Sequence, residues 1–491
     1  MPRGKEISLQ GLPRVPVVRR IAVQGVQNAW CRGQAKTHGA ERKKAVITAC
    51  STEGNAIVIL GASGNLAAKK LMPALHRLHQ RGELTDCSII VGAGRTPFTD
   101  EQFRQRFGIT DAFGGMLFYH QGIRGLKQFL AGKGKFPRVI FFFALPPDTY
   151  AQTARELTAE GFCEEASIII EKPFGSDYES AQVLNSELSA CFSESQIFRN
   201  DHYLAKEAVQ NILVFRFANA LFEPVWNGRH IESIQINACE EATVGDRAQY
   251  FDKAGIIRDM VQNHLMQLLC LLTMEAPASL GAEDIQSRKI SLLQSLAVKE
   301  CRRSQYEGYL SEKGIAAGSG TETFAELALA IDNERWAGTR IFIRTGKALH
   351  RTGTEIGIRL RPPEKNLFTG FGAGQPNVIV FKIQPEAGII LGLSGKHPGE
   401  IRIAGTRMTF CYNKAFDAEI PEAYQKLLLD AVRGDHTLFV GARETEESWR
   451  VLGSVLDKGP CGTYAKGTMP PTGLGVEWMD FDSYAAECAT E

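Results

Sequence analysis

The segment Ala56-Ile-Val-Ile-Leu60-Gly61-Ala62-Ser63-Gly64-Asn65-Leu66-Ala67 decides the fold class of this chain. Five apolar residues predict a short buried strand, and a glycine turn leads into residues 69–79, where leucines recur at helical spacing. The order strand, tight glycine turn and helix opens a dinucleotide-binding fold. Its glycines let the backbone approach a pyrophosphate at the helix N-terminus, where unpaired N–H groups favour negative charge. The residues predicted to bind the nucleotide are Gly61, Ala62, Ser63, Gly64, Asn65 and Leu66.

The second predicted strand, 88–94, indicates which nucleotide binds. It ends at Arg95, where an NAD site usually has an acidic side chain for the ribose hydroxyls. An arginine suits a 2′-phosphate instead, so the sequence favours NADP over NAD. A solvated arginine at the end of a strand is the alternative.

Two more apolar runs extend the predicted parallel sheet. Residues 138–145 end in Pro146-Pro147, and residues 167–170 end in Glu171-Lys172-Pro173. In open α/β sheets, ligands bind beyond the carboxyl ends of the strands. Lys172 is therefore predicted to contact both cofactor and substrate, with simple pairing to Glu171 as the alternative.

After residue 203 the alternation of strands and helices gives way to another pattern. One amphipathic helix at about 205–219 precedes strand-like runs whose alternation is typical of a sheet with one covered face and one wet face. The sequence thus predicts an α/β Rossmann-like NADP-binding domain at 53–200. An α+β domain with a large, mainly antiparallel sheet follows at 201–491, for substrate binding and oligomerisation. Its predicted strands are 231–238, 340–344, 354–360, 377–383 and 401–410.

The segment Arg199-Asn-Asp-His-Tyr-Leu-Ala-Lys-Glu207 gathers many ionisable groups at the predicted interdomain cleft. A packed core tolerates such groups only when they pair or meet a charged ligand. A strand at 196–199 leads His202 and Tyr203 into the cleft, and Lys206 follows one helical turn later. These three side chains are suitable donors to a phosphate monoester. A surface ion-pair network around Lys206 is the alternative.

His264 lies in a mainly apolar helical stretch, 255–269. A lone histidine in such a stretch is commonly a hydrogen-bonded core residue. Paired with a carboxylate, it is instead a general base for the oxidation of a hydroxyl, because the carboxylate orients the ring and stabilises its cation. Asp201 is the candidate partner, so we predict that Asp201 and His264 are catalytic where the fold brings them together.

The composition excludes several classes of protein. Lys plus Arg number 56 and Asp plus Glu 55, so no global charge attracts nucleic acid or an anionic membrane. No apolar run reaches the roughly 18 residues of a membrane-spanning helix. The 11 cysteines show no CxxC or Cys/His ligand spacing, which predicts no metal site and reduced, mostly buried thiols in a cytoplasmic protein.

Residues 1–52 differ from the rest of the chain. They hold ten Lys or Arg against two acidic residues, and their prolines and glycines discourage regular structure. We predict a basic, disordered N-terminal extension. A transit peptide that directs the protein to an organelle, or a start codon placed too far upstream, are the alternatives.

From about Ala56 to about residue 465, the chain resembles the glucose-6-phosphate dehydrogenase family. These are NADP-dependent enzymes that catalyse the first step of the oxidative pentose phosphate pathway. The motifs that carry the resemblance are GASGNLAAKKLMPAL (61–75), FFFALPP (141–147), EKPFG (171–175), RNDHYLAKEAVQN (199–211), YFDKAGIIRDMVQNH (250–264), IDNERWAG (331–338), RTGKAL (344–349) and LLLDAVRGDHTLF (427–439).

The resemblance implies a role for each matching residue. His264 would take the proton of the C1 hydroxyl of glucose 6-phosphate, oriented by Asp201, while hydride passes to NADP without a metal. The phosphate would be bound by His202, Tyr203 and Lys206, and the 2′-phosphate of NADP by Arg95. The remaining substrate contacts would come from Glu240, Asp259, Lys347 and Lys172. The resemblance also implies a 6-phosphogluconolactone product and a homodimer or homotetramer built through the large sheet.

Several positions depart from the family pattern. Asn200 stands where the family has isoleucine, next to Asp201, and Ala205 where it has glycine. A glycine-rich loop is replaced at 245–250, and the stretch 108–137 is shorter than usual. These departures leave two alternatives open: a relative that acts on another aldose or aldose phosphate, and a catalytically impaired paralogue that binds NADP as a sensor or structural subunit.

Overall fold

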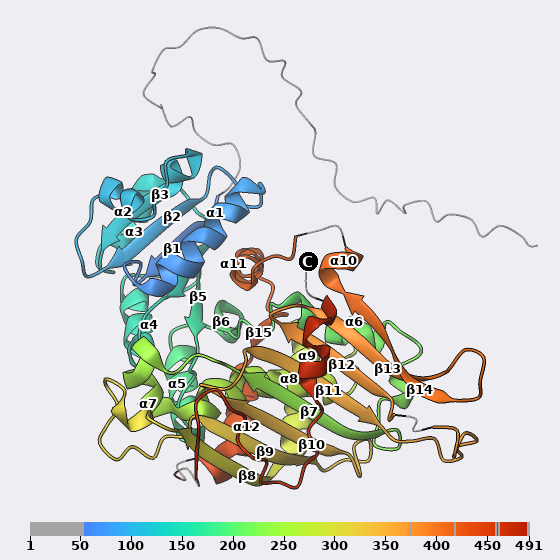
Figure 1. Cartoon of the computed structure of the whole chain (residues 1–491). Helices are drawn as coiled ribbons and strands as arrows, with labels where there is room; N and C mark the ends of the chain where they lie inside the picture. Colours follow the sequence, from blue (N-terminus) through green and yellow to red (C-terminus); the bar gives the residue numbers. More distant parts are fainter. Residues whose placement is uncertain (1–53, 373–374, 417–418, 457–458, 460–461, 489–491) are drawn as a thin grey trace, which may run out of the picture. The chain divides into compact units, whose positions relative to one another are not determined.

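The computed structural model describes residues 54–372, 375–416, 419–456, 459 and 462–488. The predicted extension at 1–52 lies outside the described residues. Two sheets organise the rest of the chain, one of seven strands and one of nine (Figure 1). They correspond to the two fold types predicted from the sequence, and the exact domain boundary at residue 200 stays a prediction.

The first sheet is the Rossmann-like sheet. Its strands β1 to β6 run parallel in the spatial order β6-β5-β4-β1-β2-β3, and β15 pairs antiparallel with β6 at the edge. Successive residues of β1 face two different buried clusters, which explains its continuously apolar sequence. The strands are β1 (Ala56–Leu60), β2 (Ile89–Gly94), β3 (Leu117–Gln121), β4 (Val139–Phe143), β5 (Ala166–Glu171), β6 (Ile197–Asn200) and β15 (Phe439–Val440).

Helices cover both faces of this sheet. One face packs against η1, α1, α2 and α11, and the other against α3, α4 and α5. The π-helix η1 follows the glycine turn directly, as the sequence predicts for a helix at that point. The helices are η1 (Ala67–Leu71), α1 (Met72–Gln80), α2 (Asp100–Arg106), α3 (Leu126–Lys133), α4 (Tyr150–Ala159), α5 (Tyr178–Ser189) and α11 (Ala423–Arg433).

The second sheet is large and mainly antiparallel, as predicted. The exceptions are the parallel pairs β10 with β7 and β16 with β8. Its strands are β7 (Ile231–Cys239), β8 (Leu296–Tyr306), β9 (Phe324–Ile331), β10 (Arg340–Gly346), β11 (Gly353–Leu360), β12 (Val378–Gln384), β13 (Gly388–Lys396), β14 (Ile403–Cys411) and β16 (Gly462–Tyr464). The helices of this half are α6 (Glu207–Phe217), α7 (Ala248–Ile256), the π-helix η7 (Ile257–Leu265), α8 (Met266–Thr273), α9 (Ala282–Ser295), α10 (Tyr412–Ala415) and α12 (Ala442–Leu452).

The alternation predicts that one face of the large sheet is exposed to solvent, and this prediction is wrong for part of that face, which other residues cover. Met479 and Phe481, from the segment after β16, pack against Val380 and Ile390. They occupy the space above Gly357, where a Cβ would lie 2.3 Å from the sulfur of Met479. The C-terminal segment thus forms a short third layer over β11, β12 and β13.

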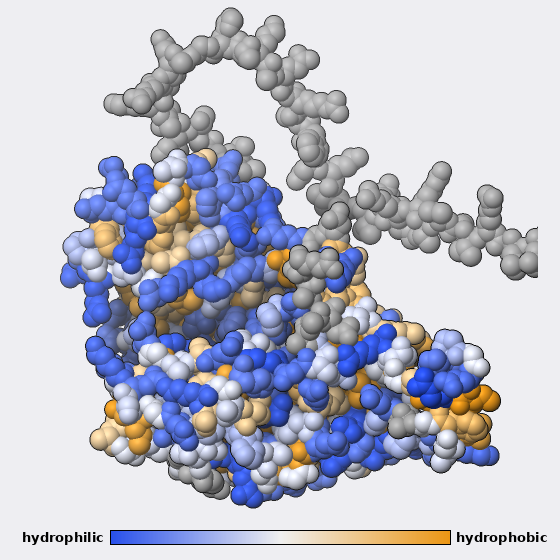
Figure 2. All heavy atoms as spheres, viewed as in Figure 1, coloured by the Kyte–Doolittle hydropathy of each residue, from blue (hydrophilic) through white to orange (hydrophobic). Residues whose placement is uncertain are grey.

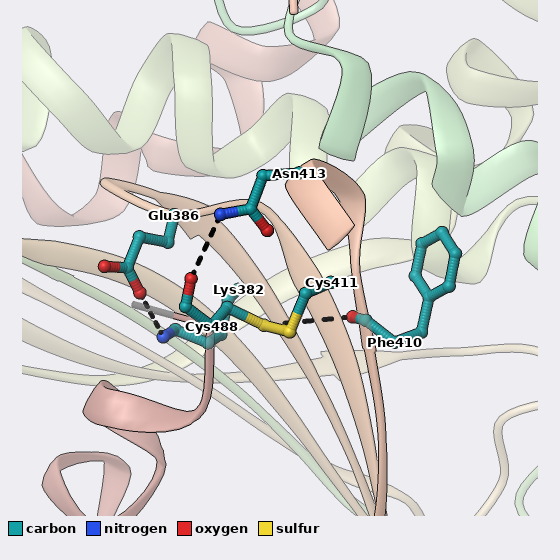
Figure 3. The surroundings of a disulfide bond; sticks show 6 residues. All are labelled: Lys382, Glu386, Phe410, Cys411, Asn413 and Cys488. Atoms are coloured by element: carbon teal, nitrogen blue, oxygen red, sulfur yellow. Dashed lines mark hydrogen bonds and ion pairs between the residues drawn. A yellow bond between two sulfur atoms is a disulfide. The ribbon is translucent and has the colours of Figure 1, made fainter. Parts of the chain in front are cut away.

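A disulfide fastens the end of this segment. Cys411, the last residue of β14, is bonded to Cys488 at the end of the 3-10 helix η10 (Phe481–Cys488) (Figure 3). The prediction of reduced thiols is therefore wrong for this pair, whereas Cys163 and Cys270 are free. Cysteine spacing does not reveal the bond, because 77 positions separate the partners and no motif links them.

Removing this bond should lower the stability of the fold. Closing a loop of this length restricts the unfolded chain, which corresponds to about 4 kcal/mol in the chain-entropy model. We expect Cys488→Ser to lower the free energy of unfolding by up to about that amount, measured by denaturant titration. Cys163→Ser, which removes an exposed free thiol, is the control. Equal stability of both variants and the parent would contradict the clamping role of the bond.

Candidate active site

The site is built where β6 ends. The chain leaves β6 through Asp201, His202 and Tyr203, and the π-helix η7 brings His264 to the same place. Wide π-helical turns are frequent at functional sites. Asp201 Oδ1 lies 2.5 Å from His264 Nδ1, although 63 positions separate the two residues. The two residues predicted to act together therefore meet in the fold.

The electrostatics of this pair favour a neutral base. Asp201 is 1% exposed and His264 is 2% exposed. Burial opposes ionisation of Asp201, yet the adjacent His264 lowers its pKa to about 2. Burial also lowers the pKa of His264, against the opposing influence of Asp201. At neutral pH the pair is thus a carboxylate and a neutral imidazole. Because a carboxylate only accepts hydrogen bonds, Nδ1 carries the proton and Nε2 is left to accept one.

The predicted phosphate-binding residues surround the His264 ring. Tyr203 stacks on it with ring centroids 4.2 Å apart, and His202 meets it edge-on at 4.6 Å. His202 and Lys206 line a cavity of about 620 Å³. The Tyr203 hydroxyl lies 3.3 Å from that of Thr354. His202 and Lys206 are thus placed to meet an anion in the cavity, beside the candidate base.

Gln384 is a residue of this cavity that the sequence patterns did not single out. Lys206 Nζ donates to its Oε1 at 2.6 Å, and its Nε2 donates to the Tyr203 hydroxyl at 3.3 Å. Burial has the largest influence on the pKa of Lys206 and lowers it. The sequence signal for Gln384 is weak: it directly follows the predicted strand 377–383 and precedes Pro385. It joins two of the predicted anion-binding residues.

A second cluster of charges centres on Asp259. Lys172 Nζ lies 3.0 Å and Arg247 Nη2 3.3 Å from its Oδ1, while Lys347 Nζ lies 4.0 Å from its Oδ2. Burial would raise the pKa of Asp259, but these cations hold it well below its usual range. Lys347 also donates to Glu240 Oε2 at 2.5 Å. The predicted sugar-binding residues form one network of alternating charge that can both donate to and accept from hydroxyls.

Arg247 is the other site residue that the patterns missed. It belongs to the loop at 245–250 that departs from the family pattern, and its guanidinium reaches Asp259 from an exposed position. Gly245 in the same loop has a φ of 49°, in the left-handed region. The altered loop therefore contributes a cation to the cluster and keeps a glycine where the backbone turns.

The turn after β1 has the shape that a pyrophosphate requires. Gly61 has a φ of 84°, and a Cβ there would lie 2.3 Å from the Ala144 carbonyl oxygen. The Gly64 N–H donates to the Gly61 carbonyl at 2.9 Å, and the helix starts at Asn65. Arg95 follows β2 and is exposed. These residues fit a dinucleotide that lies over the glycine turn with its ribose near an accessible guanidinium.

The ligand atoms of Asp201, His202 and His264 lie within 4.8 Å of one another, which is close enough to hold a metal ion. Asp201 Oδ1 is already engaged by His264 Nδ1 and by the Tyr203 N–H, at 2.5 and 3.0 Å. A carboxylate bound in this way orients an imidazole for proton transfer. Proton transfer explains the cluster without a metal.

A parallel nucleotide-binding sheet whose strands end at a carboxylate–imidazole pair is the arrangement of an NAD(P)-dependent dehydrogenase. Comparisons with known proteins narrow this class. Residues 58–112 and 118–211 match the family model for the glucose-6-phosphate dehydrogenase NAD binding domain, and residues 213–478 match that for its C-terminal domain. The chain belongs to the glucose-6-phosphate dehydrogenase family.

Individual relatives cover most of the chain. Glucose-6-phosphate 1-dehydrogenase of Bacillus subtilis (strain 168) is 38% identical over 462 residues, which cover 84% of this chain and 94% of the relative. The protein of the same name from Dictyostelium discoideum is 37% identical over 439 residues, 82% and 88% of the two chains. A solved structure of glucose-6-phosphate dehydrogenase in complex with its substrate glucose-6-phosphate is similar with a TM-score of 0.81 and 34% identity, covering 86% and 96%.

Proposed function

We propose that this protein oxidises glucose 6-phosphate at C1 and passes the hydride to NADP, forming 6-phosphogluconolactone, the first step of the oxidative pentose phosphate pathway. The observation that carries the proposal is the neutral His264 imidazole, held by Asp201 beside the cavity that His202 and Lys206 line. A base next to an anion-binding cavity suits a substrate with a reactive hydroxyl and a phosphate. The relatives described above bear the name of this activity.

The chain's residues divide the work of this reaction. His264 Nε2 takes the proton of the C1 hydroxyl as the C1–H bond breaks, its electron pair leaves as hydride, and the C1–O bond becomes a carbonyl. Asp201 keeps the ring oriented and stabilises the imidazolium that forms. Asp259 and Glu240, with Lys347 between them, hold the sugar hydroxyls. NADP, when bound, supplies the nicotinamide that accepts the hydride.

The residues present fit this cofactor. The turn at Gly61 lies so close to the Ala144 carbonyl oxygen that only glycine fits there, which keeps backbone N–H groups near the helix start, and Arg95 follows the neighbouring strand. Lys172 directly follows β5, and its Nζ donates to Asp259 Oδ1. Its side chain thus runs from the nucleotide-binding sheet to the predicted substrate residues. We therefore assign cofactor binding to residues 61–66 and Arg95, and contact with both partners to Lys172.

Replacing Arg95 with Ala tests the cofactor preference. A guanidinium that binds the 2′-phosphate makes a charge-assisted contact, and its loss should weaken NADP binding by roughly tenfold or more. The affinity for NAD, which lacks that phosphate, should change little. Both affinities are measured by the quenching of protein fluorescence as the nucleotide is added. Arg155→Ala, which removes an arginine exposed on α4, is the control. Equal losses for NADP and NAD would remove Arg95 from the 2′-phosphate site.

The proposed activity is tested by mixing purified protein with glucose 6-phosphate and NADP and following the absorbance of the reduced nicotinamide. Turnover with glucose 6-phosphate is the expected result. Turnover only with another aldose or aldose phosphate would point to a related sugar dehydrogenase. Tight NADP binding with no turnover on any aldose phosphate would favour the impaired paralogue.

We also propose a homodimer or homotetramer that assembles through the large sheet. Leu367, Phe368, Phe371 and Ile401 are exposed apolar residues. The Phe371 carbonyl accepts from the Ile403 N–H at 2.7 Å, which places this patch at the start of β14. Figure 2 shows apolar residues at the outer end of the same sheet. Light scattering of the purified protein tests the assembly, and a stable monomer at micromolar concentration would overturn it.

A cytoplasmic location is our further proposal, with an organelle as the alternative if residues 1–52 are a transit peptide. Within the described part of the chain, no helix has the length and apolar character needed to cross a membrane. The near balance of 56 basic and 55 acidic side chains gives no general attraction to nucleic acid. The partners we propose are glucose 6-phosphate, NADP and further copies of this chain.

A further inference from the structure

Glu171 is an acid at the site that the proposed reaction does not use. It ends β5 and lies in register beside Asn200 at the end of β6. Asn200 Nδ2 donates to its Oε1 at 2.6 Å, and the Tyr424 hydroxyl donates to the same atom at 3.1 Å. Two donors from separate elements, β6 and α11, thus meet on one carboxylate oxygen at the cleft end of the parallel sheet.

Both donors are shielded from water. Asn200 is 0% exposed and Tyr424 is 7% exposed. Among the described residues, the Asn200 Oδ1 atom is buried with no hydrogen-bond partner. An unsatisfied buried oxygen costs free energy, so a purely structural role would be better served by an apolar side chain. The contact of the Asn200 amide with Glu171 is what this residue offers in return, at a position where the family pattern has isoleucine.

Each donor is joined to a different part of the site. Asn200 directly precedes Asp201, the partner of the base. Tyr424 lines the same cavity as His202, and the two rings lie nearly parallel, at 15° with centroids 6.3 Å apart. Glu171 therefore connects the segment that orients the base with the wall of the phosphate cavity.

We propose that Glu171 is a positioning residue of this site, whose ionised carboxylate holds Asn200 and Tyr424 and thereby fixes both the Asp201 segment and the cavity wall. This inference rests on the proposed function. A hydrogen bond to a charged acceptor is roughly twice as strong as one to a neutral acceptor. Protonation of Glu171 therefore weakens both contacts at once, without altering any group assigned to touch the substrate.

The surroundings of Glu171 place this change near neutral pH. Protein atoms around the carboxyl group keep water away and raise its pKa to about 7, although the side chain retains some exposed area. The hydrogen bonds from Asn200 and Tyr424 and the charge of Lys172 act in the opposite direction, and Asp201 raises the pKa further.

Two further groups complete this electrostatic picture. Tyr150, from α4, donates to the backbone carbonyl of Glu171 at 3.0 Å and leaves the carboxylate to the other two donors. His264 has a pKa below its ordinary value. The Glu171 contacts are at full strength above the pKa of Glu171 and weaken as the pH falls through it. The pH profile of kcat/KM should thus show one inflection from Glu171 near neutrality and another from His264 at lower pH.

Glu171→Gln is the principal variant, because glutamine keeps the shape and an acceptor oxygen but cannot titrate. We expect kcat/KM for glucose 6-phosphate to fall by roughly tenfold at pH values above neutrality. The inflection near neutrality should vanish from the profile, while that of His264 remains. An unchanged inflection near neutrality in Glu171→Gln would overturn the proposal.

Removing either donor should move the same inflection in a known direction. Asn200→Leu and Tyr424→Phe each take away a hydrogen bond that favours the ionised carboxylate, so the inflection should rise by about one pH unit. Tyr178→Phe is the control. It removes a hydroxyl on α5 that accepts a hydrogen bond from Gln182 Nε2, and it should leave the profile unchanged. A purely structural contact would lower the melting temperature of these variants and leave the profile in place, and that result would also refute the proposal.

Binding of glucose 6-phosphate, measured by calorimetry over the same pH range, separates this proposal from the proposed activity. As the pH is lowered, the affinity of the parent for glucose 6-phosphate should fall more steeply than that of Glu171→Gln. The same steeper fall without any turnover would support the positioning role and reject the activity. Turnover with identical pH dependence in the two proteins would support the activity and reject the positioning role.

Discussion

Replacing His264 with Asn should nearly abolish turnover while glucose 6-phosphate still binds. Asparagine is smaller than histidine, and its amide can donate to Asp201, but it has no basic nitrogen to accept the C1 proton. General-base catalysis contributes about a hundredfold to ten-thousandfold to a rate. We expect kcat to fall by roughly a thousandfold, with little change in the dissociation constant of the substrate, from steady-state rates and calorimetry.

His230, a histidine outside the site, supplies the control variant. His230 lies just before β7, and its Nδ1 is 3.0 Å from Asn227 Oδ1. His230→Asn should retain the parent's kcat, so a loss confined to His264→Asn reports on the base and not on histidine replacement in general. Circular dichroism of both variants checks the fold. If His264→Asn kept a tenth of the parent's turnover, another group would have to be the base.

The core strands of the nucleotide-binding sheet could be predicted from sequence because each is a short apolar run with a clear end. The run at 56–60 is β1, and the runs at 138–145 and 167–170 contain or overlap β4 and β5. Their faces are both buried, so the side chains leave no polar interruption that would blur the pattern. The functional groups that follow them were found for the same reason, since ligands lie beyond those strand ends.

Prediction missed several strands at the edges and inside the sheets because their residues do not form such runs. β3, in the stretch at 108–137, alternates between buried and partly exposed residues. β15 has two residues and joins the first sheet from a distant part of the chain. β13 contains several glycines and ends exposed, and β8 carries a charged middle. Pairing with neighbouring strands, and not local propensity, makes these segments strands.

The candidate site could be predicted as a set of side chains but not as a geometry. Asp201 and His264 were paired on chemical grounds, and their 2.5 Å contact depends on how η7 packs against the end of β6. Gln384 and Arg247 lacked a motif of their own, and only the fold shows their contacts with Lys206 and Asp259. Contacts between distant segments are set by tertiary packing, which no local pattern records.

Replacing Lys206 with Ala should raise the KM for glucose 6-phosphate by about a hundredfold and leave kcat largely intact. A lysine that meets a phosphate makes a charge-assisted hydrogen bond, and the loss of about 3 kcal/mol corresponds to that factor. The contact exists both before and during the reaction, so its loss weakens binding more than it slows the chemical step. Lys206 is well placed for this role because it lines the cavity beside His202.

Lys70 supplies the matched control. It lines the same cavity, but its side chain is half exposed and its Nζ pairs with Glu422 at 2.8 Å. Lys70→Ala should therefore change the KM much less than Lys206→Ala, since an exposed and already paired charge contributes little to binding. The KM for glucose, which has no phosphate, should be similar in the parent and in Lys206→Ala. If Lys206→Ala weakened glucose and glucose 6-phosphate alike, the lysine would shape the cavity without recognising the phosphate.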